Sequence, residues 1–203
     1  MKLLLLFFSI PIFISCQEQK SSISLPKTEE TKTINNYLSE IKHVKEFLKT
    51  KNYNKKIAFL VDYSVPSGKK RFFVVDLVND SIIEKGLVCH GDCKGENNSD
   101  IPLIFSNKSG SNCTSLGISV IGKRDYSSWG KKYKYWIDGL ESTNKNMRKR
   151  VVVLHAWEGV PDIEIHPKVI AMSWGCPTVS VRFLDKLDFI LKTNKKVLLY
   201  SFD

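Results

Sequence analysis

The chain of 203 residues lacks the motifs of several common protein classes. It has no CxxC pairs of the zinc-finger kind, no phosphate-binding P-loop and no glycine-rich dinucleotide fingerprint, so neither a cofactor nor a nucleic-acid partner is predicted. No internal repeat or interior linker divides it, and its length is that of one domain with terminal appendages. Acidic residues are scarce, with 21 Asp and Glu against 31 Lys and Arg, and the net charge of +10 favours an anionic partner.

The beginning of the chain predicts its compartment. Lys2 is followed by an apolar run over residues 3–14, which has the length of a signal-peptide core and is too short to span a bilayer. Ser15 and Cys16 follow it, and this arrangement is similar to the lipobox of bacterial lipoproteins, in which the cysteine is acylated after cleavage. The alternative is an ordinary secretory signal beside a chance cysteine. Both interpretations predict an exported protein of the bacterial cell envelope, facing the periplasm or the outer surface.

A polar stretch follows the predicted signal peptide and has the composition of a tether. We therefore expect residues 1–15 to be the signal peptide, residues 16–33 the tether and residues 34–203 one folded domain. An exported, tethered protein meets membrane and cell wall rather than DNA, which argues against nucleic acid as the anionic partner. The membrane is expected as a partner through the lipid anchor, and no obligate protein partner is evident.

Hydrophobic periodicity predicts a mixed α+β domain in which β-strands dominate. Apolar residues recur at helical spacing from Ile34 to Leu48, with Thr33 placed as the cap, and again over residues 181–193 after Ser180. Between them lie short β-rich runs, and a last one covers residues 195–202. The predicted strands before the second helix cover residues 56–63, 71–78, 81–90, 115–122, 132–139 and 150–157. The domain is thus expected to carry one helix near each end.

Two segments place a reactive pair of side chains beside apolar runs. RVVVLHAW contains His155, and AMSWGCP contains Cys176 directly after Gly175. A nearby imidazole can take the proton of a thiol and lower its pKa below the free value of about 8.5. A glycine permits a sharp turn that presents backbone N–H groups to an oxyanion. A lone cysteine or histidine is more often structural, so it is the pair that indicates a cysteine nucleophile.

Several segments taken together resemble a known family. CHGD at 89–92, the segments 105–122 and 139–157, and SWGCP at 173–177 resemble the murein L,D-transpeptidase family with its YkuD-type catalytic domain, in the branch that has Ser-Trp-Gly before the cysteine. The resemblance covers about residues 55–203. It implies a catalytic domain of β-sandwich or barrel type. The implied activity is acyl transfer on peptidoglycan stem peptides through a thioester, giving either cross-linking or carboxypeptidase trimming.

The resemblance also implies roles for individual residues. Cys176 is the nucleophile and His155 the base that activates it. The signature loop is Ser173, Trp174 and Gly175, and the residues implied on the substrate side are His90, Gly91 and Arg150. The chain departs from the commoner signature in having Trp174 in place of histidine, and Pro177 to Val179 stand where a hydrophobic residue and an arginine are usual. If that arginine binds the stem-peptide carboxylate, another cation must do so here, and the candidates are Arg150 or a lysine in the segment before it.

A basic segment rich in aromatic residues precedes the histidine. Between Lys123 and Arg150 nine Lys or Arg stand against three acids, interleaved with aromatic side chains: Trp129, Tyr133, Tyr135 and Trp136. One interpretation is a cradle for an anionic, sugar-bearing polymer. The other is an alternating strand with one face buried and the other solvated.

The remaining cysteines allow one disulfide. Cys89, Cys93 and Cys113 are odd in number, and in an oxidising compartment either Cys89 or Cys93 can pair with Cys113. A zinc site made by Cys89, His90, Cys93 and His155 is the disfavoured alternative, because neighbouring residues such as Cys89 and His90 seldom point at one metal. We therefore predict no metal.

Two other functions use the same sequence features. One is a catalytically silent lipoprotein that binds peptidoglycan, and the other is a cysteine peptidase or amidase that acts on a different amide. The first predicts binding without turnover. The second predicts a thioester without release of D-alanine.

Overall fold

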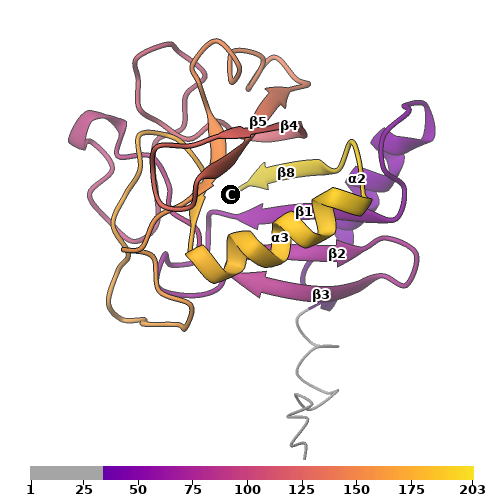
Figure 1. The fold of residues 1–203 in the computed structure, drawn as a ribbon, viewed down its shortest axis with the longest axis horizontal. Coiled ribbons are helices and arrows are strands. Elements are labelled where there is room, and N and C mark those ends of the chain that lie inside the picture. Colours follow the sequence, from indigo (N-terminus) through magenta and orange to yellow (C-terminus); the bar gives the residue numbers. More distant parts are fainter. Residues whose placement is uncertain (1–33) are drawn as a thin grey trace, which may run out of the picture.

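The computed structural model describes residues 34–203 (Figure 1). The predicted signal peptide, the tether, Thr33 and Cys16 lie outside these residues. In chain order the elements are α2 (Leu38–Lys49), β1 (Ile57–Asp62), β2 (Phe72–Asp76), β3 (Ser81–Gly86), a short 3-10 turn (Cys93–Gly95), β4 (Gly117–Tyr126), β5 (Tyr133–Gly139), β6 (Val153–Ala156), β7 (Thr178–Val179), α3 (Val181–Thr193) and β8 (Leu198–Phe202). Within residues 34–203 no helix has the length and apolar character needed to cross a membrane.

The strands form one sheet in the order β3-β2-β1-β8-β4-β5-β6-β7. Neighbouring strands are antiparallel, except for the parallel pairs β1–β8 and β6–β7. Beyond the end of β3, Val88 forms an antiparallel bridge with Val179 of β7, and the Cys89 N–H donates to the Thr178 carbonyl at 2.9 Å. The two ends of the sheet therefore meet, and the sheet is a nearly closed barrel. This confirms the predicted β-dominated fold of barrel type.

The two helices cover opposite faces of the sheet (Figure 1). Alternate residues of one strand supply the two cores, because successive side chains of a strand point to opposite faces. Phe59 of β1 packs in the core that contains Leu184 of α3, whereas Leu60 packs in the core that contains Val44 of α2. Burial of each such side chain stabilises the fold by about 1.5–3 kcal/mol.

The predicted elements are found close to their expected positions. The second helix begins as expected at Ser180, whose hydroxyl accepts a hydrogen bond from the Phe183 N–H. The strand expected over residues 150–157 is shorter, because the backbone turns at Val151, which has a φ of 59°. The two-residue strand β7 was not predicted, because two residues carry no periodicity.

Two of the four aromatic residues proposed for the cradle lie in the core. Tyr133 and Tyr135 of β5 are buried, and their hydroxyls donate to Asp185 and Asp188 of α3 at 2.7 and 2.6 Å. Trp129 is 64% exposed. The interpretation as an alternating strand is therefore right for Tyr133 and Tyr135. These two members of the proposed cradle are buried and cannot contact a polymer.

Candidate active site

The parallel pairing of β6 and β7 brings the two predicted reactive residues together. His155 lies opposite Thr178 in this pair, and Thr178 follows Cys176 by two residues. The Cys176 Sγ accepts a hydrogen bond from the Val153 N–H at 3.5 Å. The thiol therefore lies beside β6 at Val153, two residues before His155. Within residues 34–203 no hydrogen bond joins the thiol to the imidazole directly.

Both nitrogens of His155 have partners. Nδ1 lies 3.2 Å from the carbonyl oxygen of Ala156, and Nε2 lies 2.9 Å from Oγ1 of Thr178. A carbonyl oxygen can only accept, so the hydrogen bonds assign the proton of the neutral ring to Nδ1. The lone pair of Nε2 then faces the Thr178 hydroxyl, which also lies 3.3 Å from the Cys176 carbonyl. Ala156 and Thr178 thus orient the imidazole, and neither was identified from the sequence.

Burial favours the neutral forms of both reactive groups. It raises the pKa of the Cys176 thiol, against the opposing effects of the Val153 N–H and of the charges on Arg150 and Lys134. Burial also lowers the pKa of His155, and Lys134 lowers it further, while the hydrogen bond to Ala156 raises it. The predicted lowering of the thiol pKa is therefore wrong for the free protein. Burial destabilises the thiolate more than the neighbouring N–H group and positive charges stabilise it.

The signature loop is held in place by Ser173. The Ser173 N–H donates to the His90 carbonyl at 2.7 Å, and its hydroxyl donates to the Cys176 carbonyl at 2.7 Å. The Gly175 N–H donates to the same hydroxyl at 3.2 Å. Among the described residues the Cys176 N–H donates to no protein group, so it is the free donor beside the sulfur. The Trp174 side chain of this loop is 75% exposed.

Gly175 cannot be replaced without strain. Its φ is +96°, a conformation that L-residues rarely adopt. A β-carbon at this position would also lie 2.6 Å from the carbonyl oxygen of Cys113. The glycine is therefore required both by the turn and by the close approach of a neighbouring loop.

His90 and Gly91 lie beneath the signature loop. Gly91 forms a parallel bridge with Ser173, so this segment supports the loop through its backbone. The His90 side chain is 1% exposed, and its Nδ1 lies 2.8 Å from Nη2 of Arg71. Its role at the substrate side stays a prediction, and the side chain faces the interior.

Arg71 is a fully buried cation that the sequence did not single out. Its guanidinium donates to the backbone carbonyls of Val65, Val88 and Asp100 and to His90. A guanidinium always donates, so the Nδ1 of His90 accepts, and the proton of its neutral ring lies on Nε2. That buried Nε2 makes no hydrogen bond in the described part of the chain. Burial, followed by the charge of Arg71, lowers the pKa of His90 to about 4.

Arg150 lies beside the signature loop, and its guanidinium is engaged by protein groups. Nη1 donates to the Ser106 carbonyl and the Ser115 hydroxyl at 2.8 and 2.5 Å. Nη2 donates to the Cys113 carbonyl at 2.6 Å and to the Ser111 hydroxyl at 3.3 Å. Nη2 would also lie 3.2 Å from a β-carbon built on Gly175, so the structure brings Arg150 close to the signature loop.

The cysteines resolve one of the alternatives left by the sequence. Cys93 is bonded to Cys113, which is one of the two predicted pairings, while Cys89 is a buried free thiol. Burial raises the pKa of Cys89 to about 12. Within residues 34–203 no three metal-ligating side chains come together, and Cys93 is taken by the disulfide, so the alternative zinc ligands do not converge.

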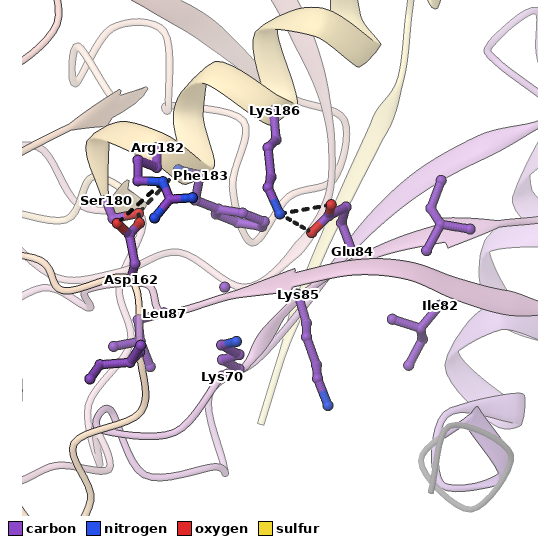
Figure 2. A pocket seen from close by; sticks show the side chains of 13 residues that line it. Lys70, Ile82, Glu84, Lys85, Leu87, Asp162, Ser180, Arg182, Phe183 and Lys186 are labelled. Carbon is purple, nitrogen blue, oxygen red and sulfur yellow. Dashed lines mark hydrogen bonds and ion pairs between the residues drawn. The ribbon is translucent and has the colours of Figure 1, made fainter. Parts of the chain in front are cut away.

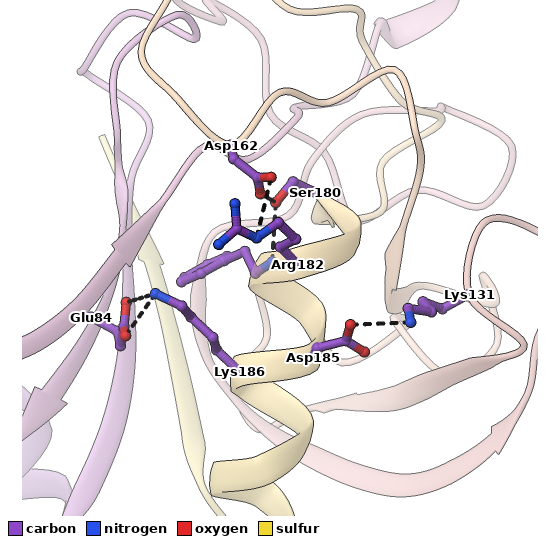
Figure 3. A network of polar contacts seen from close by, with 8 residues as sticks. Glu84, Lys131, Asp162, Ser180, Arg182, Asp185 and Lys186 are labelled. Atoms are coloured by element: carbon purple, nitrogen blue, oxygen red, sulfur yellow. Dashed lines mark hydrogen bonds and ion pairs between the residues drawn. The ribbon is translucent and has the colours of Figure 1, made fainter. Parts of the chain in front are cut away.

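A cavity of about 550 Å³ lies away from the reactive pair (Figure 2). It is bounded by β3 and the first turns of α3 and contains neither His155 nor Cys176. Glu84 and Lys186 face each other across it at 2.9 Å, and Arg182 lies 3.9 Å from Asp162. Figure 3 shows that these contacts join α3 to its surroundings, with Asp185 reaching Lys131 on the far side. Both carboxylates of the cavity thus pair with cations of α3, whereas Lys70 and Lys85 form no ion pair among the described residues.

Comparison with solved structures gives distant likenesses that include the following three. An L,D-transpeptidase from Xylanimonas cellulosilytica is 9% identical, with a TM-score of 0.43 over 75% of this chain and 63% of that chain. An L,D-transpeptidase from Stackebrandtia nassauensis is 17% identical, with a TM-score of 0.41 over 84% and 66%. The helical cell shape determining protein Pgp2 from Campylobacter jejuni is 14% identical, with a TM-score of 0.40 over 83% and 54%. The chain spans between about half and two thirds of these structures.

The family comparison covers most of the chain. A comparison with curated proteins gave no match. The family model of the L,D-transpeptidase catalytic domain, in contrast, matches residues 28–201, which include the signature loop and all of the β-sheet except Phe202 at the end of β8. The chain therefore belongs to the family of L,D-transpeptidase catalytic domains.

Proposed function

We propose that this protein is a cysteine acyltransferase that acts on peptidoglycan stem peptides. Family membership supports the reaction class, and one observation carries the assignment of the reactive groups. The β6–β7 pairing brings Cys176, the predicted nucleophile, beside His155, the predicted base. The substrate bond is the amide between a centre of L configuration and a terminal D-alanine.

The first step transfers a proton as the sulfur attacks. Because burial favours a neutral thiol and a neutral imidazole, the thiol proton moves to Nε2 of His155 while Sγ bonds to the carbonyl carbon. The Thr178 hydroxyl turns to the Cys176 carbonyl, 3.3 Å away, and frees the Nε2 lone pair. When the carbon–nitrogen bond breaks, His155 returns the proton to the departing amine of D-alanine. A thioester on Cys176 remains.

The oxyanion formed in this step needs a donor near the sulfur. The Cys176 N–H has no protein partner in the described part of the chain, whereas the Gly175 N–H is already bonded to Ser173. We assign the Cys176 N–H as a donor to the oxyanion. Such a donor is commonly worth roughly 3–4 kcal/mol in the transition state.

The second step determines the product. The side-chain amine of a second stem peptide attacks the thioester carbon, giving a new amide and restoring the thiol, or water attacks and gives a free carboxylate. The first outcome is a cross-link and the second is trimming. Both use the same thioester on Cys176.

We further propose that the protein is exported and anchored to the membrane by acylation of Cys16. The support is the signal-like run and the residues before Cys16 in the sequence. Metabolic labelling with a radioactive fatty acid is expected to label the native chain. Cys16→Ser is expected to abolish the label, whereas an ordinary secretory signal predicts no label in either chain.

Intact-mass spectrometry after incubation with a disaccharide tetrapeptide tests the main proposal. We expect a covalent adduct whose mass shows loss of one alanine, and no adduct on Cys176→Ala. Binding without an adduct would support the silent wall-binding protein, and an adduct without loss of alanine would support another cysteine hydrolase. Either result contradicts the proposal.

A further inference from the structure

Arg150 has little capacity left for a substrate carboxylate. A guanidinium has five N–H donors, and four of those of Arg150 point at Ser106, Ser111, Cys113 and Ser115. Only the Nε N–H is without a protein partner among the described residues. Bidentate recognition of a carboxylate needs two parallel N–H groups. Arg150 would have to break at least one of its contacts of 2.5–3.3 Å to provide them.

The same guanidinium lies next to the nucleophile. A β-carbon built on Gly175 would lie 3.2 Å from Nη2 of Arg150 and 2.6 Å from the Cys113 carbonyl. Gly175 directly precedes Cys176, so the charge acts on the thiol at short range. In agreement with this geometry, Arg150 is among the groups that oppose the rise in the pKa of Cys176.

The Cys93–Cys113 disulfide constrains the loop that accepts the hydrogen bonds of Arg150. Residues 102–107, and residues 111–116 that contain Cys113, have no regular secondary structure. The bond from Cys113 to Cys93 ties this loop to the turn that begins at Asp92. The Asp92 N–H in turn donates to the Ser173 carbonyl at 2.9 Å. The disulfide therefore joins the turn at Asp92, which binds the signature loop, to the loop that binds Arg150.

We propose that Arg150, held by the disulfide-bonded loop, is a positioning residue that stabilises the Cys176 thiolate instead of a receptor for the substrate carboxylate. This inference rests on the proposed function, in which Cys176 becomes a thiolate as it attacks. It predicts that the reactivity of the thiol depends on Arg150 and on the Cys93–Cys113 bond even when no substrate is present.

The test is the pH dependence of Cys176 alkylation by iodoacetamide in the full chain, followed by peptide mapping at Cys176. The charged and titratable groups that act on this thiol are Arg150, Lys134 of β5 and Tyr63. His155 lies two residues beyond Val153, which the thiol contacts. Arg150→Met is expected to shift the profile upward by about one pH unit, so alkylation near pH 7 slows about tenfold. Arg148→Met is the matched control, because that arginine pairs with Asp138, and its profile should match the unmodified chain.

Two further variants separate the parts of the proposal. Cys93→Ser combined with Cys113→Ser keeps Arg150 but frees its loop, and a slowing of about threefold is expected. Ser115→Ala removes one acceptor of Arg150 and is the milder variant if circular dichroism shows that the double variant is unfolded. It should slow alkylation by about twofold.

Two results would overturn the proposal. An Arg150→Met profile identical to that of the unmodified chain would remove the role of the arginine. Normal alkylation in both the folded double-serine variant and Ser115→Ala would remove the role of the loop. Because alkylation needs no peptidoglycan, a chain that shows the expected shifts without releasing D-alanine would contradict the proposed function and leave this inference intact.

Discussion

The half of the sheet made by β1, β2, β3 and β8 is built differently from the end that carries β6 and β7. In the first half β1 and β2 are buried over nearly their whole length and pair in continuous register. At the other end β6 and β7 are short, and long loops are held by side-chain hydrogen bonds. Residues with positive φ gather in these loops: Cys93, Lys94, Asn112, Val151 and Gly175. Apolar burial stabilises the first half, and the strained backbone is concentrated around the reactive pair.

The strongest test of this contrast removes the nucleophile. Cys176→Ala is expected to lower release of D-alanine by at least about 10³-fold, because no other group forms the thioester. The free energy of unfolding should change by no more than about 1 kcal/mol, since the thiol is partly exposed and makes only long contacts. Amino-acid analysis of the product and urea denaturation measure the two effects. A variant that remains fully acylated would show that the sulfur is not the nucleophile.

The opposite result is expected in the packed half. Leu60 of β1 is 1% exposed and lies in the core under α2. Leu60→Ala leaves a cavity and should reduce the free energy of unfolding by about 2–5 kcal/mol. Alkylation of Cys176, measured below the unfolding temperature, should keep its rate. A large loss of thiol reactivity in the folded variant would show that the two regions are coupled more tightly than their construction suggests.

His90 makes the stability of the folded protein sensitive to acid. Its pKa is lowered to about 4 in the folded protein, whereas an unfolded histidine titrates near 6.5. The unfolded chain therefore binds a proton below about pH 6.5 that the folded chain does not, and stability falls as the pH drops to about 4. The expected loss is about 3 kcal/mol, measured by urea denaturation across this range. His90→Asn should flatten the slope, and an unchanged slope would contradict the assignment.

The smallest expected effect concerns the hydroxyl beside the base. The neutral form of His155 is the active base, so activity should fall as the pH drops through its lowered pKa. Thr178→Val removes the hydroxyl that donates to Nε2 at 2.9 Å, and loss of this stabilisation of the neutral ring should move the acidic limb of kcat/KM upward. A decrease of a few-fold is expected at mildly acid pH. Thr178→Ser should restore the profile, and a profile that does not move would leave Thr178 without a role in holding the imidazole.

Local sequence patterns predicted most of the regular elements. Short β-rich runs located β1, β2 and β5, and helical spacing after Ser180 located α3 with its cap. These signals depend on neighbours within a few residues. The turn at Val151 and the two-residue strand β7 were not predicted, because pairing with distant segments decides both.

The candidate site was predicted in part. The spacing of His155 and Cys176 and the glycine before the cysteine pointed to two segments that the structure brings together. The engagement of Arg150 by the loop at Ser106 to Ser115 could not be read from the chain, because every acceptor lies 35 or more residues away. The buried Arg71 was missed for the same reason, since its partners are mostly backbone carbonyls.

By itself the amino-acid sequence determined which side chains this protein can use: a thiol after a glycine, an imidazole at a strand end and an excess of positive charge. Chemical identity and short-range periodicity are written in the chain, so they need no folding to be recognised. Tertiary packing alone decided that Cys93 bonds to Cys113, that Arg150 is engaged by protein groups and that burial raises the pKa of Cys176. Desolvation and hydrogen bonding are sums over residues that meet only in the folded protein.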